Sequence, residues 1–343
     1  MRCVFKFSVN MNKATWTKVW LAGTCFLLWL MVMLGGATRL THAGLSIVEW
    51  RPLTGIFPPL NYKDWQHLFQ LYQQYPEYQS VFPTMSLNEF KFIFWMEYTH
   101  RLLGRLIGIF FAVPMISLWR DLPFSLRSRG LVALALGGIQ GIVGWYMVKS
   151  GLINDPRVSP YRLTLHLGLA FFLYGWVLWM LLDSLSGKKA EKVKGSWQAG
   201  GLLIFMGQLL TMIYGGLVAG HHAGLIYNTF PLMEGEWLPQ EWDFYSPVWI
   251  NFFKNEALVQ WLHRVLAVVS WLSLIGYWFF GRLKRKTQHL THWLIATTVQ
   301  GILGITTLLY QVPVSLGVLH QGWAIVVLTT ALITLHPRRD AVL

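Results

Sequence analysis

Charged residues are scarce in this chain of 343 residues. Only 13% of its residues are Asp, Glu, Lys or Arg, whereas 54% are hydrophobic and 15% are aromatic. A soluble domain carries about 25% charged residues, so this composition excludes an ordinary cytosolic enzyme and a disordered tail and indicates a protein of the lipid bilayer. The net charge of +13 also suits a nucleic-acid partner. No basic stripe with interleaved aromatic residues is present, however, and we expect no such partner.

Cysteine is almost absent as well. The two cysteines are Cys3, near the start of the chain, and Cys25, inside an apolar run. This number excludes a disulfide framework, a thiolate zinc site, a cysteine redox pair and a Cys-x-x-Cys-His attachment motif. Any metal or redox chemistry must therefore use other ligands.

Long apolar runs dominate the rest of the sequence. A helix needs roughly 20 apolar residues to cross a hydrocarbon core about 30 Å thick. Eight runs reach this length and predict an all-α integral membrane protein, with helices over residues 16–38, 92–118, 129–148, 161–182, 198–219, 257–280, 290–310 and 313–335. Two longer loops remain, at 39–91 and 220–255, and their proline and aromatic residues favour ordered lids over flexible tethers.

The distribution of Lys and Arg predicts the orientation of these helices. Cytoplasmic loops of membrane proteins carry an excess of basic residues. If the N-terminus is cytoplasmic, most Lys and Arg fall on that side, in the segments 2–18, 120–129, 188–194, 282–286 and 338–339. We therefore expect a multi-pass protein of the cell inner membrane with both termini in the cytoplasm.

Sequence motifs recur in the two parts of the chain, in the same order and in successive apolar runs. The matched pairs are Gly35-Gly36 with His42-Ala43-Gly44-Leu45 and Gly215-Gly216 with His222-Ala223-Gly224-Leu225; His100-Arg101 and His263-Arg264; Gln140-Gly141-Ile142-Val143-Gly144 and Gln300-Gly301-Ile302-Leu303-Gly304; and Leu165-His166 with Gly168 and Leu319-His320 with Gly322. Four matched pairs indicate a duplication. Because each half has an even number of spans, both halves insert with the same orientation, as two parallel four-helix bundles.

This duplication predicts the division of the chain. The predicted segments are a cytoplasmic N-terminus at 1–15, an N-terminal half at 16–182, a cytoplasmic linker at 183–197, a C-terminal half at 198–335 and a cytoplasmic tail at 336–343.

Each half has two histidines at matching positions of the repeated motifs. They are His100 and His166 in the first half, and His263 and His320 in the second. Each falls about seven residues after the start of a helix that runs inward from the outer face, roughly 10 Å deep at 1.5 Å per residue. An ionisable residue in a span is a functional candidate, because it is costly in hydrocarbon. A single membrane histidine is more often a satisfied core residue, but two homologous pairs at equal depth favour a shared ligand.

Two facing imidazoles without thiolates or carboxylate clusters are what a planar iron porphyrin needs for axial ligation, so each half is predicted to hold a heme site near the outer face. Gly104, Gly108 and Gly168 would leave room for a flat ring, although close helix packing explains such glycines too. Arg101 and Arg264 suit a propionate carboxylate, with a snorkelling or structural arginine as the alternative.

The halves differ at a position beside these histidines. Glu97 precedes His100 by three residues, whereas Gln260 takes the equivalent place in the second half. Residues three apart share a helix face. A carboxylate can accept a proton or stabilise a developing cation, whereas an amide cannot take the proton. The first half is therefore predicted to perform chemistry and the second to hold a non-reacting redox heme. Arg105, which corresponds to Val268 in the repeat, adds to this difference.

Three segments carry a resemblance to a known family. They are Phe94-Trp95-Met96-Glu97-Tyr98-Thr99-His100-Arg101-Leu102-Leu103-Gly104-Arg105, Gly144-Trp145-Tyr146-Met147-Val148-Lys149-Ser150-Gly151-Leu152 and Tyr227-Asn228-Thr229-Phe230-Pro231-Leu232-Met233-Glu234-Gly235. The chain resembles the heme A synthase family of the proteobacterial and mitochondrial type, along essentially all eight spans. Members of that family oxidise the C8 methyl of heme O to a formyl group, through a hydroxymethyl intermediate and a second hydroxylation, and so make heme A for cytochrome oxidase.

The resemblance implies roles for the residues already singled out. The implied iron ligands are His263 and His320 for a prosthetic heme b, and His100 and His166 for the substrate heme O. The implied catalytic residues are Glu97, His100 and His166, and the implied heme-contacting residues are Arg264, Arg101 and Arg105. The implied partners are heme O synthase, which is a protoheme farnesyltransferase, an unidentified electron donor or acceptor, and the lipid bilayer. A homo-oligomer and the source of the inserted oxygen, water or O₂, remain open.

Two features depart from the family, and two other functions stay compatible with the sequence. Some members carry a cysteine pair in an outer loop, which this chain lacks. The doublet His221-His222 lies in a turn, where we expect a solvated pair without a role. The other functions are a di-heme b-type electron-transfer cytochrome linked to quinol, and a transporter with parallel repeats, which would bind no heme.

Overall fold

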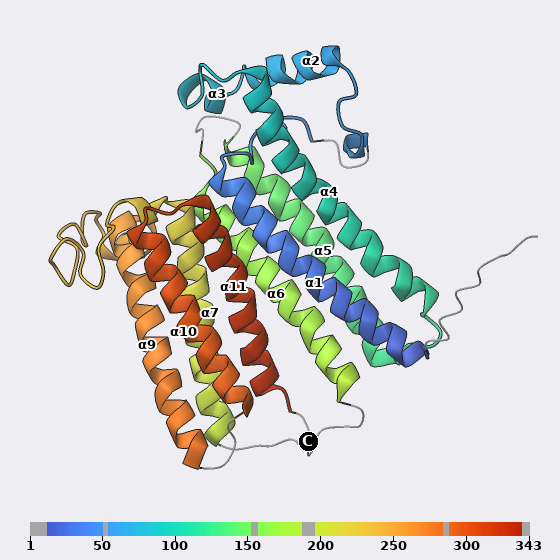
Figure 1. The fold of residues 1–343 in the computed structure, drawn as a ribbon, viewed down its shortest axis with the longest axis vertical. Coiled ribbons are helices and arrows are strands. Elements are labelled where there is room, and N and C mark those ends of the chain that lie inside the picture. The colour runs from blue at the N-terminus through green and yellow to red at the C-terminus, as the bar shows by residue number, and fades with distance from the viewer. Residues whose placement is uncertain (1–11, 51–53, 152–156, 187–195, 284–287, 338–343) are drawn as a thin grey trace, which may run out of the picture.

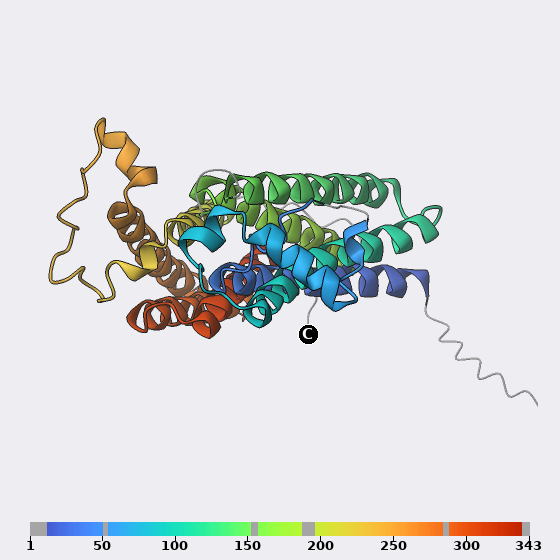
Figure 2. The same cartoon turned by 90° about the horizontal axis from the view of Figure 1, so that it is seen from above.

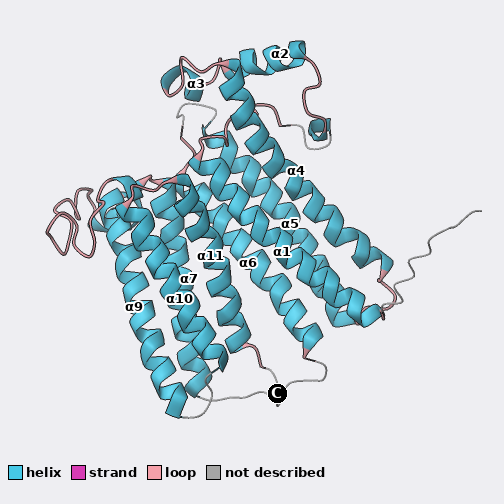
Figure 3. Ribbon diagram, in the orientation of Figure 1, coloured by secondary structure: helices cyan, strands magenta, loops and turns pink. Residues whose placement is uncertain are grey.

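The computed structural model describes residues 12–50, 54–151, 157–186, 196–283 and 288–337, and within these ranges it is helical, with no β-strand (Figure 3). A single bridge pairs Met233 with Glu236. Eight of the helices are long and apolar enough to cross a membrane. They are α1 (Lys13–Leu40), α4 (Leu87–Ser117), α5 (Phe124–Gly151), α6 (Pro160–Leu185), α7 (Ser196–Gly220), α9 (Glu256–Leu283), α10 (Gln288–Leu309) and α11 (Val314–Leu335). The prediction of an all-α chain with eight apolar spans is confirmed.

The helix ends differ from the predicted spans for a local reason. Helix α4 begins at Leu87, before the predicted start at 92, because Ser86 and Glu89 form a capping box. The Ser86 main-chain N–H donates to the Glu89 carboxylate at 2.7 Å. Such a cap satisfies free N–H groups of the first turn. Hydropathy reports only the apolar part of a helix, whereas capping fixes where the helix starts.

The eight long helices form two neighbouring groups. Helices α1, α4, α5 and α6 lie on one side, and α7, α9, α10 and α11 lie on the other (Figure 1). The groups meet where α1 packs on α11 and where α6 packs on α7 and α11, as the view from above also shows (Figure 2). The boundaries of the two halves stay a prediction, and the segments 1–15, 183–197 and 336–343 lie largely outside the described residues.

The contact between the groups combines apolar packing with a few polar anchors. One apolar cluster spans it and includes Leu21 of α1, Met180 of α6 and Ile325 of α11, each at most 2% exposed. The Trp29 indole N–H donates to the Gly322 carbonyl oxygen at 3.0 Å. Hydrogen bonds between helices satisfy polar groups that lipid cannot, so this anchor fixes how α1 meets α11.

The two long loops at one end of the helix groups, which we call the outer end, contain short helices that the apolar pattern does not reveal (Figure 1). The first lid, residues 41–86, holds η1 (Thr54–Ile56), α2 (Tyr62–Tyr72) and α3 (Pro76–Ser80), and it lies over the outer end of α4 (Figure 1). The second lid, residues 221–255, holds η2 (Ala223–Leu225), η3 (Val248–Ile250) and α8 (Asn251–Lys254). Both lids lie at the outer ends of the long helices.

Gly220 tests the packing between the two groups. A Cβ at this position would lie 2.5 Å from the Pro160 Cα atom, which is backbone and cannot turn aside. We expect Gly220→Ala to destabilise the protein by about 1–3 kcal/mol, as overpacking does. Gly276→Ala is the matched control, because a Cβ there meets no atom within 4 Å. Thermal unfolding in detergent measures both variants, and equal melting temperatures would contradict the packing described.

Candidate functional site

Each group of helices brings two of the predicted histidines together. His100 on α4 interacts electrostatically with His166 on α6, and His263 on α9 does so with His320 on α11. All four side chains are half-buried. The described residues contain no group of three or more His, Cys, Asp or Glu that could hold a bare metal ion. Each pair offers two imidazoles that would suit a group that brings most of the ligands of its own metal.

Glycines lie against the histidine rings at equivalent positions of both halves. An added Cβ would stand 3.1 Å from a ring atom of His100 at Gly35, 2.9 Å from His166 at Gly144, 3.1 Å from His263 at Gly215 and 2.9 Å from His320 at Gly304. No side chain fits there without moving the ring. These glycines belong to the repeated sequence motifs, so the sequence contained a pattern that could have singled them out.

The glycines that the sequence singled out behave differently. A Cβ at Gly104 would lie 3.2 Å from the Met31 methyl carbon, so this glycine serves helix packing. A Cβ at Gly108 or Gly168 meets no atom within 4 Å. Gly108 follows His100 by eight residues, about two turns, whereas Gly168 follows His166 by only two residues and lies on another face of its helix.

Polar partners orient three of the four histidines. The His263 Nδ1 atom lies 3.0 Å from the Thr211 carbonyl oxygen, which leaves Nε2 for a metal. The Gln140 amide donates to the His166 carbonyl at 3.0 Å, and the Gln300 amide donates to the His320 carbonyl at 3.1 Å. Each amide nitrogen also lies 3.4 Å from the ring Nε2 atom of that histidine. The sequence showed both glutamines as a repeated motif without indicating this contact.

Glu97 is buried at the outer end of α4. Its side chain is 2% exposed. The carboxylate accepts hydrogen bonds from the Ser46 hydroxyl and the Ile47 main-chain N–H, both at 2.7 Å. It also pairs with the Arg101 guanidinium at 2.6 Å. Three donors, one of them charged, satisfy an acid that would otherwise be costly to bury.

Arg101 continues this contact into the first lid. Its guanidinium donates to the Ile47 carbonyl at 3.0 Å and to the Glu49 carbonyl at 3.4 Å. It also lies 5.2 Å from the centre of the Trp50 ring. We call Arg101 with Glu97 and these carbonyls the first clasp. It ties the lid to α4 one turn from the first histidine pair.

A matching second clasp joins α9 to the second lid. The Arg264 guanidinium donates to the Tyr227 carbonyl at 2.8 Å and to the Thr229 carbonyl at 2.7 Å. Its acceptor on the helix is the Gln260 amide oxygen at 3.1 Å, and the Gln260 amide N–H groups reach the Ala223 carbonyl at 2.8 Å. The carbonyls of the two clasps fall at equivalent places of the repeated motifs. The two clasps thus share one arrangement and differ in one side-chain group, which is the carboxylate of Glu97 in the first and the amide of Gln260 in the second.

Each lid covers a cavity at the outer end of its half. The first cavity, about 330 Å³, is lined by Arg101 and Arg105 together with Tyr98, Glu49 and His67. Two arginines in one cavity favour a carboxylate-bearing ligand. Sequence reasoning placed both arginines here but did not include His67, which α2 contributes.

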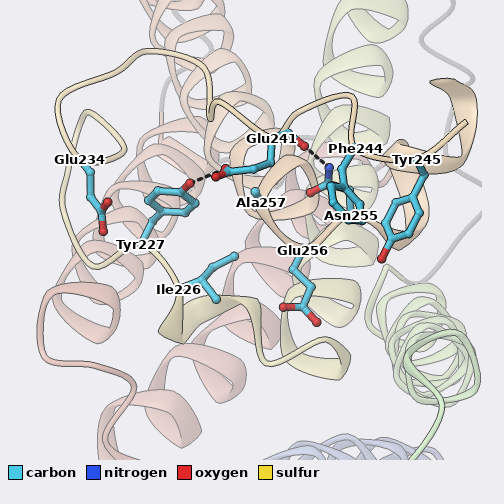
Figure 4. A pocket seen from close by; sticks show the side chains of 9 residues that line it. All are labelled: Ile226, Tyr227, Glu234, Glu241, Phe244, Tyr245, Asn255, Glu256 and Ala257. Atoms are coloured by element: carbon cyan, nitrogen blue, oxygen red, sulfur yellow. Dashed lines mark hydrogen bonds between the residues drawn. The ribbon is translucent and has the colours of Figure 1, made fainter.

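The second cavity, about 360 Å³, is acidic (Figure 4). The Tyr227 hydroxyl points to Glu241 and donates to its carboxylate at 2.8 Å. Burial, together with the hydrogen bond and charge of Glu241, raises the pKa of Tyr227 to about 12. Tyr227 therefore stays neutral, and its hydrogen bond joins two parts of the second lid.

The doublet His221-His222 is half-buried and makes contacts that the sequence did not predict. The His222 ring stacks on His42, with ring centroids 6.1 Å apart and an angle of 11° between the planes. Burial, then the charge of Arg39, lowers the pKa of His222 to about 4, so it stays neutral. A ring nitrogen of His221 lies 2.8 Å from the Phe253 carbonyl oxygen. The stacked rings of His42 and His222 join the two halves, whereas the His221 contact lies within the second lid, and a turn motif alone reveals neither contact.

Comparison with known proteins agrees with this arrangement. The sequence matches the model of the family COX15-CtaA, cytochrome oxidase assembly protein, over residues 18–332. Proteins named heme A synthase from Parvibaculum lavamentivorans and Nitrosospira multiformis are 42% and 44% identical, over 98% and 94% of this chain and 97% and 93% of their own length. A heme A synthase of Paramagnetospirillum magneticum is 44% identical over 93% of this chain and 92% of its own. With its eight apolar helices the protein is a multi-pass membrane protein. It belongs to the COX15-CtaA family of cytochrome oxidase assembly proteins.

Proposed function

We propose that this protein is a heme A synthase, which oxidises the C8 methyl of heme O to a formyl group through two successive hydroxylations. The family match and the names of its relatives support this activity. The observation that carries this proposal is the carboxylate of Glu97 in the first clasp. One carboxylate lies in the first clasp, where the second clasp has the Gln260 amide in the same framework. Of these two equivalent positions, the one in the first clasp offers a carboxylate that can take a proton, and the one in the second does not.

The two histidine pairs receive different hemes in this proposal. His100 and His166 hold the iron of the substrate heme O, and His263 and His320 hold a resident heme b. The donor set fits, because each half offers paired imidazoles with glycine beside each ring. The contact of His263 Nδ1 with the Thr211 carbonyl fixes the tautomer that an iron ligand needs. When bound, the resident heme supplies a redox centre for single electrons.

Glu97 takes the proton that leaves the methyl carbon as it is oxidised. Arg101 keeps the carboxylate in place, and the Ser46 hydroxyl and the Ile47 N–H define its orientation. Arg101 and Arg105 line the cavity above and suit the propionates of the substrate. The first lid closes this end of the site against water, which strengthens electrostatic contacts inside.

The membrane setting follows from the same proposal. In this proposal the protein lies in the cell inner membrane with both termini in the cytoplasm, which the distribution of Lys and Arg supports. Both heme sites then lie near the outer face. Heme O synthase supplies the substrate, whose hydrocarbon tail remains in lipid, and an electron partner of unidentified nature completes the reaction.

Glu97→Gln tests the catalytic assignment. We expect conversion of heme O to heme A to fall by roughly 10² to 10⁴-fold, the usual contribution of a positioned proton acceptor. The fold should survive, because Gln260 shows that an amide fits such a clasp. Heme extraction and chromatography from a strain that accumulates heme O measures the change.

Glu89→Gln is the control on the same helix, because glutamine also completes a capping box. It should convert heme O as the unchanged protein does. Full conversion by Glu97→Gln would exclude the catalytic role, and an unchanged protein that binds heme without converting heme O would be an electron-transfer cytochrome.

Alanine variants of the histidines test the division between the halves. We expect His263→Ala and His320→Ala to lose the absorbance of the resident heme b, because each removes a side chain that would hold that heme. His100→Ala should keep this absorbance and stop turnover. Visible spectra of the purified variants provide the measurement, and loss of the resident heme in His100→Ala would reverse the roles of the halves.

A further inference from the structure

The hydrogen bond of His263 has no counterpart in the first half. The His263 Nδ1 atom lies 3.0 Å from the Thr211 carbonyl oxygen of α7. His100 stands at the matching position of the first half, and its ring forms no hydrogen bond with any residue that the structure describes. The two halves therefore differ at a histidine as well as at the neighbouring position of Glu97 and Gln260.

The orientation of the two rings accounts for this difference. A Cβ added at Gly215 would stand 3.1 Å from the Cε1 atom and 3.6 Å from the Nδ1 atom of His263. A Cβ added at Gly35 would stand 3.1 Å from the Nε2 atom and 3.7 Å from the Cδ2 atom of His100. His263 thus turns Nδ1 toward α7, whereas His100 turns the carbon atom Cδ2 toward α1 in its place.

Gly215 exposes the carbonyl that His263 uses. In helix α7 the Thr211 carbonyl accepts from the N–H of Gly215, four residues later. A carbonyl oxygen has a second lone pair, and the imidazole reaches it because Gly215 has no side chain. The Thr211 hydroxyl donates instead to the Gly207 carbonyl at 2.9 Å, so it does not compete for this oxygen.

The second histidine of each pair differs in the same direction. The Gln300 amide nitrogen lies 3.3 Å from the His320 Nδ1 atom. The His166 Nδ1 atom is buried and has no hydrogen-bond partner within the described part of the chain. Both histidines of the second half therefore have a polar group at Nδ1, and neither histidine of the first half has one.

We propose that these polar groups at Nδ1 determine how long each half keeps its heme, so that the second half retains a resident heme and the first half exchanges substrate for product. This inference rests on the proposed function. A histidine that donates its second ring N–H to a carbonyl is fixed in place and is a stronger metal ligand. Release from the first half breaks only the bond between iron and imidazole nitrogen, whose electron pair stays on the nitrogen, so it needs no oxidant or reductant.

Matched alanine variants test the hydrogen bond. Gly215→Ala and Gly35→Ala each bring a Cβ to 3.1 Å from a histidine ring atom, but only Gly215→Ala moves a ring away from a carbonyl. We expect Gly215→Ala to speed release from the second half by about 10- to 100-fold, the usual effect of losing such a partner. Gly35→Ala should change release from the first half little.

Transfer of hemin to apomyoglobin measures release. The full-length protein is loaded with hemin in detergent, excess apomyoglobin takes up what is released, and visible absorbance follows the transfer. The unchanged protein should show a fast and a slow phase, and His166→Ala should remove the fast phase and His320→Ala the slow one. A single phase in the unchanged protein overturns the proposal even if a variant folds poorly. An unchanged slow phase in Gly215→Ala, or equal effects of the two glycine variants, does so too.

The midpoint potential of the resident heme is a second readout, which looser packing alone would not move in a set direction. A hydrogen-bonded imidazole is more basic and favours the oxidised iron, so Gly215→Ala should raise the potential and Gly35→Ala should leave it unchanged. A potential that stays the same or falls in Gly215→Ala would exclude the hydrogen bond as the cause of retention. An unchanged protein that shows both phases but converts no heme O would exclude the proposed function, while the difference in retention would stand.

Discussion

The outer end of each half depends on one kind of contact, in which an arginine of a membrane helix donates to main-chain carbonyls of a lid. Arg101 and Arg264 make this contact with the same geometry. It satisfies carbonyls that irregular backbone leaves unpaired and places the lid one turn from a histidine pair. The position of the lid, the burial of Glu97 or Gln260 and the shape of the outer cavities all follow from it.

The two clasps can support different chemistry because one side-chain group differs between them. In the first clasp the guanidinium meets a carboxylate, and in the second it meets an amide. The carboxylate of the first clasp can take a proton and so lose its charge, whereas the amide of the second clasp cannot. Under the proposed function, the difference between Glu97 and Gln260 separates a site that reacts from a site that holds a redox heme.

The sequence predicted the spans and the four histidines because each leaves a signal along the chain: apolar length for the spans and repetition for His100 and its counterparts. It did not predict α2 and α3, whose mixed polar and aromatic residues form no apolar run. Nor did it predict that Ser46 reaches Glu97 or that Gln140 reaches His166. Such contacts depend on which helix faces which, and only the packed structure determines this.

The stacked pair of His42 and His222 carries a consequence for the origin of the chain. Each ring touches its own counterpart in the other half. A residue that meets its own equivalent lies on a local two-fold axis, as in the isologous interface of a symmetric dimer. Under the predicted duplication, a single four-helix ancestor would have carried this surface on each copy, and pairing of two copies would predate their fusion into one chain.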